Sequence, residues 1–291
     1  MNHLAASELI LNKDGSIYHL NLRPEQLADT VILVGDQDRV SKITKYFDHV
    51  ELSVQKREFH TQTGTYKGKR ISVLSTGIGT DNIDIVLNEL DALVNIDFDT
   101  REIKEKKTRL DIVRVGTSGS IQKEIPVDSI LASKLSVGFD SLLHFYQSED
   151  VQLQDFNDAL EDHLQLHSGS SRPYVVECDL ELAEKFDAPE LIYGFTGSNV
   201  GFYAPQGRVL RLALKDQDLR AKIATFSFKA EKITNLEMET SAIYGLSKLL
   251  GHRALSINAI IANRPTGEFT KDGAKAVDNA IRFTLEKLSS F

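Results

Sequence analysis

The chain has 291 residues, of which 41% are hydrophobic and 26% are charged, and its formal net charge is −8. This composition is typical of a folded globular protein, and the acidic charge argues against the basic surface with which proteins hold nucleic acids. We therefore expect no nucleic-acid partner, and any anionic ligand must be held by a few arginines gathered in a pocket. The lone Cys178 excludes an internal disulfide and a cysteine-based zinc site. No catalytic-cysteine pattern surrounds it, so we expect a small buried or half-buried residue there.

The N-terminal segment MNHLAASELILNKDGS lacks the basic and apolar regions of a secretion signal, and no apolar run is long enough to cross a membrane. We therefore expect a cytoplasmic protein with no membrane partner. The basic run from Arg101 to Lys107 is interleaved with Glu102 and Glu105, which is typical of a solvated surface.

Four short runs rich in Val, Ile and Leu predict buried strands, because each run is followed at once by turn residues. Ligands of α/β proteins gather at the carboxyl ends of strands, so the loops after these runs are where chemistry is expected. The runs are 30–34, 71–74, 111–115 and 254–262, and the loops begin at Gly35, Ser75, Gly116 and Asn263.

Between the strands, apolar residues fall on one helical face at 83–94, 238–250 and 277–288. Strands that alternate with helices predict a three-layer α/β fold with a mixed or mainly parallel sheet. We find no repeat and no linker, so we expect a single domain over residues 1–291.

Arg114 stands inside an otherwise apolar strand, where an unpaired charge is very costly. A bound anion would compensate this charge, and so would an internal carboxylate; the residues alone leave both open. Gly116 and Gly119 let backbone amides approach an anion, and Thr117 and Ser118 add hydroxyl donors. The segment is either an anion site or a tight turn beside a paired arginine.

Gly35 follows the first strand, and Arg39 lies four residues further on. This pattern fits a second phosphate-binding corner, or a turn in which Asp38 caps the next helix. Two further arginines, Arg57 and Arg264, have no interpretation on their own.

Thr234 and Glu237 have the spacing of a capping box, which predicts a helix start. That reading leaves Glu239 unexplained, near the start of a helix whose later turns are apolar. A carboxylate facing a cleft can accept hydrogen bonds from two vicinal hydroxyls, so a ribose-binding role is the alternative.

Phe202 lies close in sequence to Gln206 and Arg208. An aromatic ring can stack on a planar base, a glutamine can read a pyrimidine edge with donor and acceptor together, and an arginine can donate to carbonyl oxygens. The alternative is a polar surface loop.

Motifs for metals and cofactors are missing from the sequence. There is no HExxH, no GxxxxGK[ST] and no GxSxG, and Gly77-Ile-Gly79 lacks the third glycine of a dinucleotide fingerprint. We therefore expect no cofactor.

The segments GDxDR, REF, STGIG, RVGTSG, FYxxQxR, EMET and NR occur in this order. Together they resemble the uridine phosphorylases of the nucleoside phosphorylase family, from about His19 to Arg264. The resemblance implies an α/β fold with a central mixed, partly barrel-like sheet flanked by helices. It implies a metal-free reaction in nucleoside salvage, in which uridine and inorganic phosphate give uracil and ribose 1-phosphate.

The resemblance also implies the phosphate site. Gly35, Arg39, Arg114 and Thr117 would hold the phosphate, and Arg57 would reach the phosphate of a neighbouring subunit. The family therefore implies a homo-oligomer, a dimer or a hexamer, whose active sites are shared across subunits.

For the nucleoside, the resemblance places the ribose on Glu237, Met238 and Glu239, and His19 would reach the 5′-hydroxyl across a subunit boundary. The base would bind Phe202, Gln206 and Arg208. The residues expected to act in catalysis are Arg114, Gln206, Arg208 and Arg264.

The chain departs from the family pattern at several places. Gln37 replaces the proline of GDPDR, and Ala204-Pro205 replaces a Pro-Gly pair. Glu58 matches a family site for a monovalent cation between subunits, but Asn82 stands where the family has serine. The stretch 94–110 is longer than usual, and we expect a surface excursion away from the chemistry.

Three rival functions remain. A purine nucleoside phosphorylase on the same fold would carry an aspartate where this chain has Asn263-Arg264. A hydrolytic nucleosidase would not need the arginines Arg39, Arg57 and Arg114. A catalytically inactive ligand-binding regulator would not need a chemically competent residue at every motif position.

Overall fold

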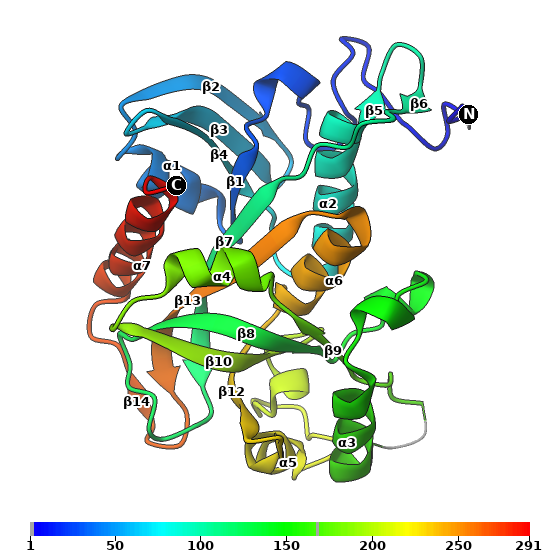
Figure 1. Ribbon diagram of the computed structural model, residues 1–291. Helices are drawn as coiled ribbons and strands as arrows, with labels where there is room; N and C mark the ends of the chain where they lie inside the picture. Colours follow the sequence, from blue (N-terminus) through cyan, green and yellow to red (C-terminus); the bar gives the residue numbers. More distant parts are fainter. Residues whose placement is uncertain (1–2, 167–168) are drawn as a thin grey trace.

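The structure is a computed structural model that describes residues 3–166 and 169–291. Strands alternate with helices along most of the chain (Figure 1). The elements are β1 (Thr30–Val34), α1 (Gln37–Thr44), β2 (His49–Lys56), β3 (Phe59–Tyr66), β4 (Lys69–Ser75), α2 (Thr80–Asn95), β5 (Ile96–Asp97), β6 (Glu102–Ile103), β7 (Asp111–Ser120), β8 (Ile130–Gly138), α3 (Gln154–Leu164), β9 (Tyr174–Glu177), α4 (Leu180–Phe186), β10 (Leu191–Ser198), the 3-10 turn η4 (Ala204–Gln206), α5 (Leu219–Thr225), β11 (Ser227–Phe228), β12 (Glu231–Glu237), α6 (Thr240–Leu250), β13 (Arg253–Asn263), β14 (Glu268–Phe269) and α7 (Gly273–Leu288). Short 3-10 turns lie at Pro24–Gln26, Leu142–Phe145 and Glu149–Val151.

One mixed sheet of 12 strands runs through the described residues, in the order β11-β12-β10-β8-β13-β7-β1-β4-β3-β2, with β14 on β13 and β9 on β8. β1 is parallel to both β4 and β7, whereas β8 is antiparallel to β13. The antiparallel pairing of β12 with β7 links two strands that are far apart in this order. It closes β12, β10, β8, β13 and β7 into a ring, so the partly barrel-like sheet is confirmed.

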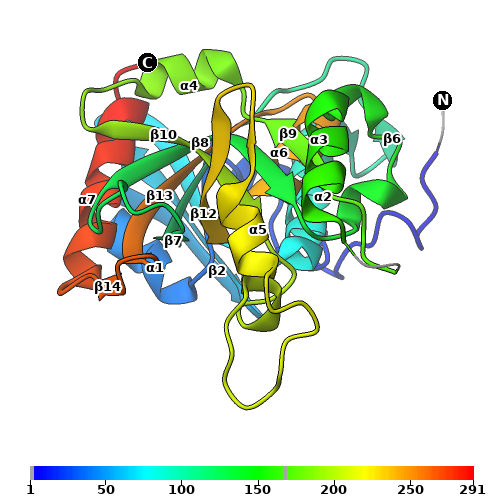
Figure 2. The same ribbon diagram turned by 90° about the horizontal axis from the view of Figure 1, so that it is seen from below.

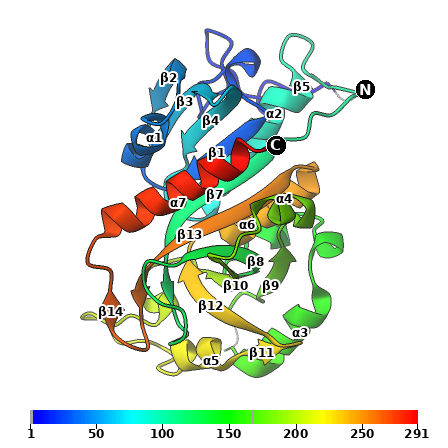
Figure 3. The same ribbon diagram turned by 60° about the vertical axis from the view of Figure 1, so that its left-hand side comes forward.

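Helices cover both faces of the sheet. α7 runs across β7 and β13 on one face, while α2 and α6 pack against each other on the other (Figure 3). The apolar faces of α2 and α7 are buried as their periodicity predicts. The predicted three-layer α/β fold is therefore confirmed.

Two boundaries differ from the sequence prediction. The strand expected at 111–115 continues to Ser120, because β13 pairs with it as far as Asn263. Residues 116–119 are therefore strand, not the loop that their glycines suggested. The helix expected to include Met238 begins at Thr240, and the Thr234–Glu237 capping box is wrong because both residues lie in β12.

Within the stretch 94–110, residues 96–103 form the small β5–β6 hairpin, which contacts the N-terminal segment. The Arg101 guanidinium donates to the carbonyl oxygens of Leu4, Ala5 and Leu9, and the Leu4 amide donates back to the Arg101 carbonyl. The excursion thus anchors residues 4–9. A second excursion, between η4 and α5, projects from the body (Figure 2).

Cys178 is 2% exposed, so the expected small buried residue is confirmed. Burial raises the pKa of its thiol to about 12. Because the thiolate is the reactive species, we expect no alkylation of native protein by iodoacetamide at pH 8, and one modified thiol per chain after unfolding in guanidinium. Mass spectrometry distinguishes the two states, and rapid alkylation of native protein would contradict this burial.

No helix among residues 3–166 and 169–291 combines the length and the apolar character needed to cross a membrane.

Candidate active site

A cavity of about 680 Å³ opens where β1, β7 and β12 end. It takes in most of the predicted site, because these strands deliver the motif loops to one edge of the sheet. From the predicted set it is lined by Gly35, Arg39, Arg114, Thr117, Phe202, Gln206, Arg208, Glu237, Met238 and Glu239.

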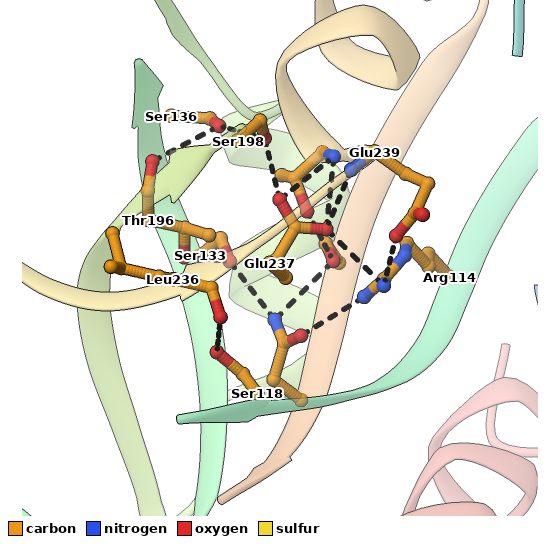
Figure 4. Close-up of polar contacts among 12 residues, drawn as sticks. Arg114, Ser118, Ser133, Ser136, Thr196, Ser198, Leu236, Glu237 and Glu239 are labelled. Atoms are coloured by element: carbon orange, nitrogen blue, oxygen red, sulfur yellow. Dashed lines mark hydrogen bonds and ion pairs between the residues drawn. The ribbon is translucent and has the colours of Figure 1, made fainter. Parts of the chain in front are cut away.

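Arg114 is 5% exposed and lines this cavity. Its guanidinium points toward Glu237 and Glu239 (Figure 4). Its Nη2 lies 2.6 Å from Glu239 and 3.2 Å from Glu237, and its Nη1 donates to Asn258 at 2.9 Å. The side chain folds back over Gly116, where a Cβ would lie 2.0 Å from the guanidinium. Gly116 is therefore required for the space that Arg114 takes, not for a turn.

Burial by itself would lower the pKa of Arg114, but the negative charges of Glu237 and then Glu239 raise it. The sequence left open whether a bound anion or an internal carboxylate compensates the charge of Arg114. The structure shows that internal carboxylates do so. Arg114 nevertheless faces the cavity, so pairing does not exclude an anion there.

Glu237 ends β12, and its carboxylate accepts from the backbone amides of Glu239 and Thr240 and from the Ser198 hydroxyl. Glu237 thus caps α6 from the preceding strand, an arrangement that differs from the predicted Thr234–Glu237 capping box. Negative charge at this helix N-terminus is also favoured by the helix dipole.

Glu239 is 5% exposed. One carboxylate oxygen accepts from the Gly79 amide at 2.9 Å and the other from Arg114. Burial raises the pKa of Glu239 against the opposing charge of Arg114, and the nearby Glu237 raises it further. A buried, fixed carboxylate next to a cavity is suited to accept hydrogen bonds from a ligand.

Arg39 comes from the first turn of α1, whose N-cap is Asp36 rather than the Asp38 considered from the sequence. Its guanidinium donates to the Val115 carbonyl at 3.2 Å. Burial lowers its pKa, and the positive charge of Arg114 lowers it further. Two guanidinium groups that repel one another in one cavity favour an anion between them.

The opposite wall carries the predicted base site. Arg208 lies with its Cζ 3.9 Å over the Phe202 ring, and it donates to the Phe202 carbonyl at 2.7 Å and to the Gln206 side-chain oxygen. Gln206 is 2% exposed, while Phe202 is 51% exposed. A planar cation stacked on an aromatic ring beside a fixed amide is a geometry that a planar polar base could also use.

Arg264 lies behind this wall and does not line the cavity. Its Nη1 donates to the Gln206 carbonyl at 2.6 Å, and its Nη2 lies 3.5 Å from the Gly207 carbonyl. Burial and then the neighbouring Arg208 lower its pKa to about 10. Both contacts are to the backbone of the loop that carries Gln206 and Arg208, so the catalytic role expected of Arg264 stays a prediction.

His19 and Arg57 lie outside the cavity but near each other. The Tyr18 ring centroid is 4.7 Å from that of His19 and 5.8 Å from the Arg57 Cζ. The His19 Nδ1 is 2.6 Å from Glu89 on α2, which also accepts from the His19 and Leu20 amides. His19 is half-buried and Arg57 is exposed, and neither residue lines this chain's own cavity.

In the described part of the chain, no group of three or more His, Cys, Asp or Glu could hold a metal ion. Glu58 is half-buried in the turn between β2 and β3, beside Gly77 and Asn82. The cation suggested at Glu58 stays a prediction that needs a neighbouring copy.

Sequence reasoning missed the residues that fix the charged groups. Asn258 binds Arg114 from inside the strand ring, where its amide also donates to Ser133. Gly79 binds Glu239 and Ser198 binds Glu237. A polar Asn258 inside the apolar run 254–262 was the same kind of signal that singled out Arg114.

The sequence profile of the phosphorylase superfamily matches residues 29–289. This chain belongs to that superfamily. The match covers both walls of the cavity, so the site lies within the part of the chain that carries the family likeness.

Relatives of this phosphorylase superfamily member span most of its length. It is 31% identical over 271 residues to a uridine phosphorylase of Thermococcus kodakarensis, covering 90% of this chain and 83% of that one. It is 28% identical over 261 residues to a DeoD-type purine nucleoside phosphorylase of Bacillus velezensis, covering 87% and 90%. A Trypanosoma brucei nucleoside phosphorylase, described as showing uridine phosphorylase activity, superposes with a TM-score of 0.87 at 28% identity, covering 98% and 100%.

Proposed function

We propose that this protein is a uridine phosphorylase, which converts uridine and inorganic phosphate into uracil and ribose 1-phosphate. One observation carries the proposal: the buried Arg114–Glu239 pair faces the same cavity as the Phe202, Gln206 and Arg208 wall. The Arg114 guanidinium could bind phosphate, and the Glu239 carboxylate could accept hydrogen bonds from ribose hydroxyls. The wall formed by Phe202, Gln206 and Arg208 could bind a planar polar base.

Phosphate would bind at Gly35, Arg39, Arg114 and Thr117. Its attack on C1′ of the ribose forms the C1′–O bond as the bond from C1′ to the base nitrogen breaks. Arg39 and Arg114 would hold the phosphate oxygens close to C1′, which replaces a costly bimolecular encounter by an oriented one. Glu239 would accept from the ribose hydroxyls, with Glu237 behind it and Met238 against the sugar.

The electron pair of the breaking bond passes into the departing uracil. Arg208 and the Gln206 amide would donate to the base as its negative charge develops, while Phe202 packs against the ring. Donors fixed before the reaction stabilise such charge without reorganising, which makes them effective. Arg264 would contribute by holding the loop that carries both donors.

We further propose that the site is completed by a second copy of the chain. Within one chain, the proposed phosphate site contains the positive charges of Arg39 and Arg114. The negative charges of Glu237 and Glu239 line the same cavity and balance them. A phosphate dianion needs additional positive charge. Arg57 and His19 lie next to Tyr18, outside this cavity. Arg57 would supply a positive charge to the phosphate of the partner copy, and His19 would bind the ribose 5′-hydroxyl there.

The alternative is a purine nucleoside phosphorylase. A purine leaving group must be protonated at N7, and the position that would carry the necessary aspartate holds Arg264, which is turned toward backbone carbonyls. The guanidinium and amide of Arg208 and Gln206 suit the carbonyl oxygens and N–H of uracil. A hydrolytic nucleosidase would have no use for the guanidinium groups of Arg39 and Arg114.

The test is a panel of nucleosides incubated with the purified protein, with and without phosphate, followed by chromatography of the free base. We expect uracil release from uridine only when phosphate is present, with ribose 1-phosphate as the second product. Release of hypoxanthine from inosine would instead identify the purine enzyme, and release without phosphate would identify a hydrolase. No release from any nucleoside would indicate a binding protein.

We expect Glu239 to set an acid limb in the pH profile of kcat/KM. Its raised pKa means that falling pH protonates it before an ordinary glutamate, and a protonated Glu239 no longer balances Arg114 or accepts freely from ribose. Rising pH through this pKa restores the charge and the activity. Phosphate itself titrates, so the readout is the difference between the wild-type and Glu239→Gln profiles; coincident acid limbs would contradict the assignment.

The single domain over 1–291 and a cytoplasmic location complete the proposal. The continuous sheet from β11 to β2 supports the first, because no described boundary divides it. The second agrees with the small, intracellular class of substrates proposed here, a nucleoside and inorganic phosphate.

A further inference from the structure

We infer that Gln37 is a positioning residue, which holds the turn that carries Arg57 in the conformation needed for phosphate binding. The inference rests on the role proposed above for Arg57. It concerns a different residue, one that makes its own contacts and lies in the wall of the cavity.

Gln37 is the first residue of α1, beside Gly35 and Arg39. Its side chain spans from the cavity wall to the tip of the β2–β3 hairpin. The Gln37 Nε2 donates to the Arg57 carbonyl at 2.6 Å, and its Oε1 accepts from the Gln55 side chain at 3.1 Å. Both ends of the amide are therefore engaged with the hairpin.

The turn that Gln37 contacts is strained and exposed. Arg57 follows β2 directly with a φ of 55°, in the left-handed region that a residue with a side chain adopts at a cost. Among the described residues, the Arg57 guanidinium has no hydrogen bond or ion pair and only approaches the Tyr18 ring. The backbone of the turn, and not a side-chain partner, therefore sets where the guanidinium points.

Helix α1 does not need the Gln37 side chain. Asp36 caps the helix by accepting from the Asp38 amide at 3.0 Å, and Gln37 stands at the first helical position, where the backbone amide has no intrahelical partner. Proline is favoured at that position, and Asp36 already has the extended backbone that precedes proline. Gln37→Pro should thus remove the side-chain amide, and with it the contact to Arg57, while α1 stays intact.

Gln37 connects two phosphate sites through its bond to the Arg57 carbonyl. The residue lies in the phosphate corner of its own chain and fixes the hairpin tip that would enter the corner of a partner copy. Its loss should weaken phosphate binding and leave the nucleoside wall unchanged. A general structural role would not separate the two substrates in this way.

The experiment measures KM for phosphate, KM for uridine, kcat and Tm for the full chain and four variants. Gln37→Pro and Gln37→Ala remove the contact by two routes, so a folding defect in one does not decide the result. Arg57→Ala measures what Arg57 itself contributes. Gln55→Ala is the matched control, because it removes a bond to Gln37 but leaves the one from Gln37 to Arg57.

We expect both Gln37 variants to raise KM for phosphate by about three- to tenfold, the effect of losing one hydrogen bond's worth of positioning. Arg57→Ala should raise it more, and Gln55→Ala should match the wild type, with Tm and KM for uridine unchanged throughout. An unchanged phosphate KM in both Gln37 variants, beside a raised one in Arg57→Ala, would overturn the inference and leave the proposed function standing. An equal rise in both KM values would also overturn it. A normal phosphate KM in Arg57→Ala would overturn the proposed role of Arg57, and the inference with it.

Discussion

Replacing Arg114 by alanine is expected to lower kcat/KM for uridine at least about 100-fold, because a preorganised cation beside the reacting atoms is lost. The same change leaves the buried carboxylates of Glu237 and Glu239 without their positive partner, because they lie 3.2 Å and 2.6 Å from the guanidinium. Removing one partner of a buried ion pair costs about 3–5 kcal/mol of stability. Steady-state kinetics and thermal unfolding measure the two effects separately.

A double variant, Arg114→Ala with Glu239→Gln, separates catalysis from folding. It leaves one fewer uncompensated charge, so we expect it to regain part of the stability lost by Arg114→Ala. Activity should stay low, because the cation is still missing. Near-normal turnover of the single variant, or recovery of activity in the double variant, would remove Arg114 from the mechanism.

Replacing Arg208 by alanine is expected to lower kcat/KM by a similar factor, about 100-fold or more, with little loss of stability. Arg208 is half-buried, and its contacts are the exposed Phe202 ring and groups of its own loop. If it stabilises the charge that develops on uracil, a base that carries negative charge more easily should depend on it less. We therefore expect the deficit of the variant to shrink with 5-fluorouridine as substrate.

Arg208→Lys is the control, because it keeps the positive charge but lacks the planar guanidinium group. We expect its kcat/KM to lie between those of the wild type and the alanine variant. Equal deficits of Arg208→Ala with uridine and 5-fluorouridine would limit Arg208 to binding. Near-normal kinetics with uridine would exclude it from the site.

The sequence was sufficient for the elements whose pattern is local. The strand at 30–34 was predicted with the bounds that the structure has, because all five of its residues are buried and Gly35 ends the run. It was insufficient where pairing decides the outcome. Gly116 and Gly119 look like turn residues, yet they are strand because β13 extends beside them.

The same division holds for the site. Motif order placed most of the predicted residues around one cavity, since they lie in or just after strands that meet at the same edge of the sheet. It could not tell whether Arg114 is compensated by a ligand or by a carboxylate, because Glu239 is distant in sequence. It could not find Gln37 as a contact of Arg57 either, because the two residues are 20 positions apart and only the folded hairpin brings them together.

The closed strand ring also has a consequence for when this site comes into being. β12 meets β7 through only two residue pairs, and the bond from Asn235 to Ser118 joins positions 117 residues apart. Contacts of such sequence separation carry a large loop-closure entropy, which the contacts made by the closed ring must offset. Since Glu237 ends β12 and Glu239 follows it, whereas Arg114 lies in β7, the charged centre is complete only when these two strands have been brought together.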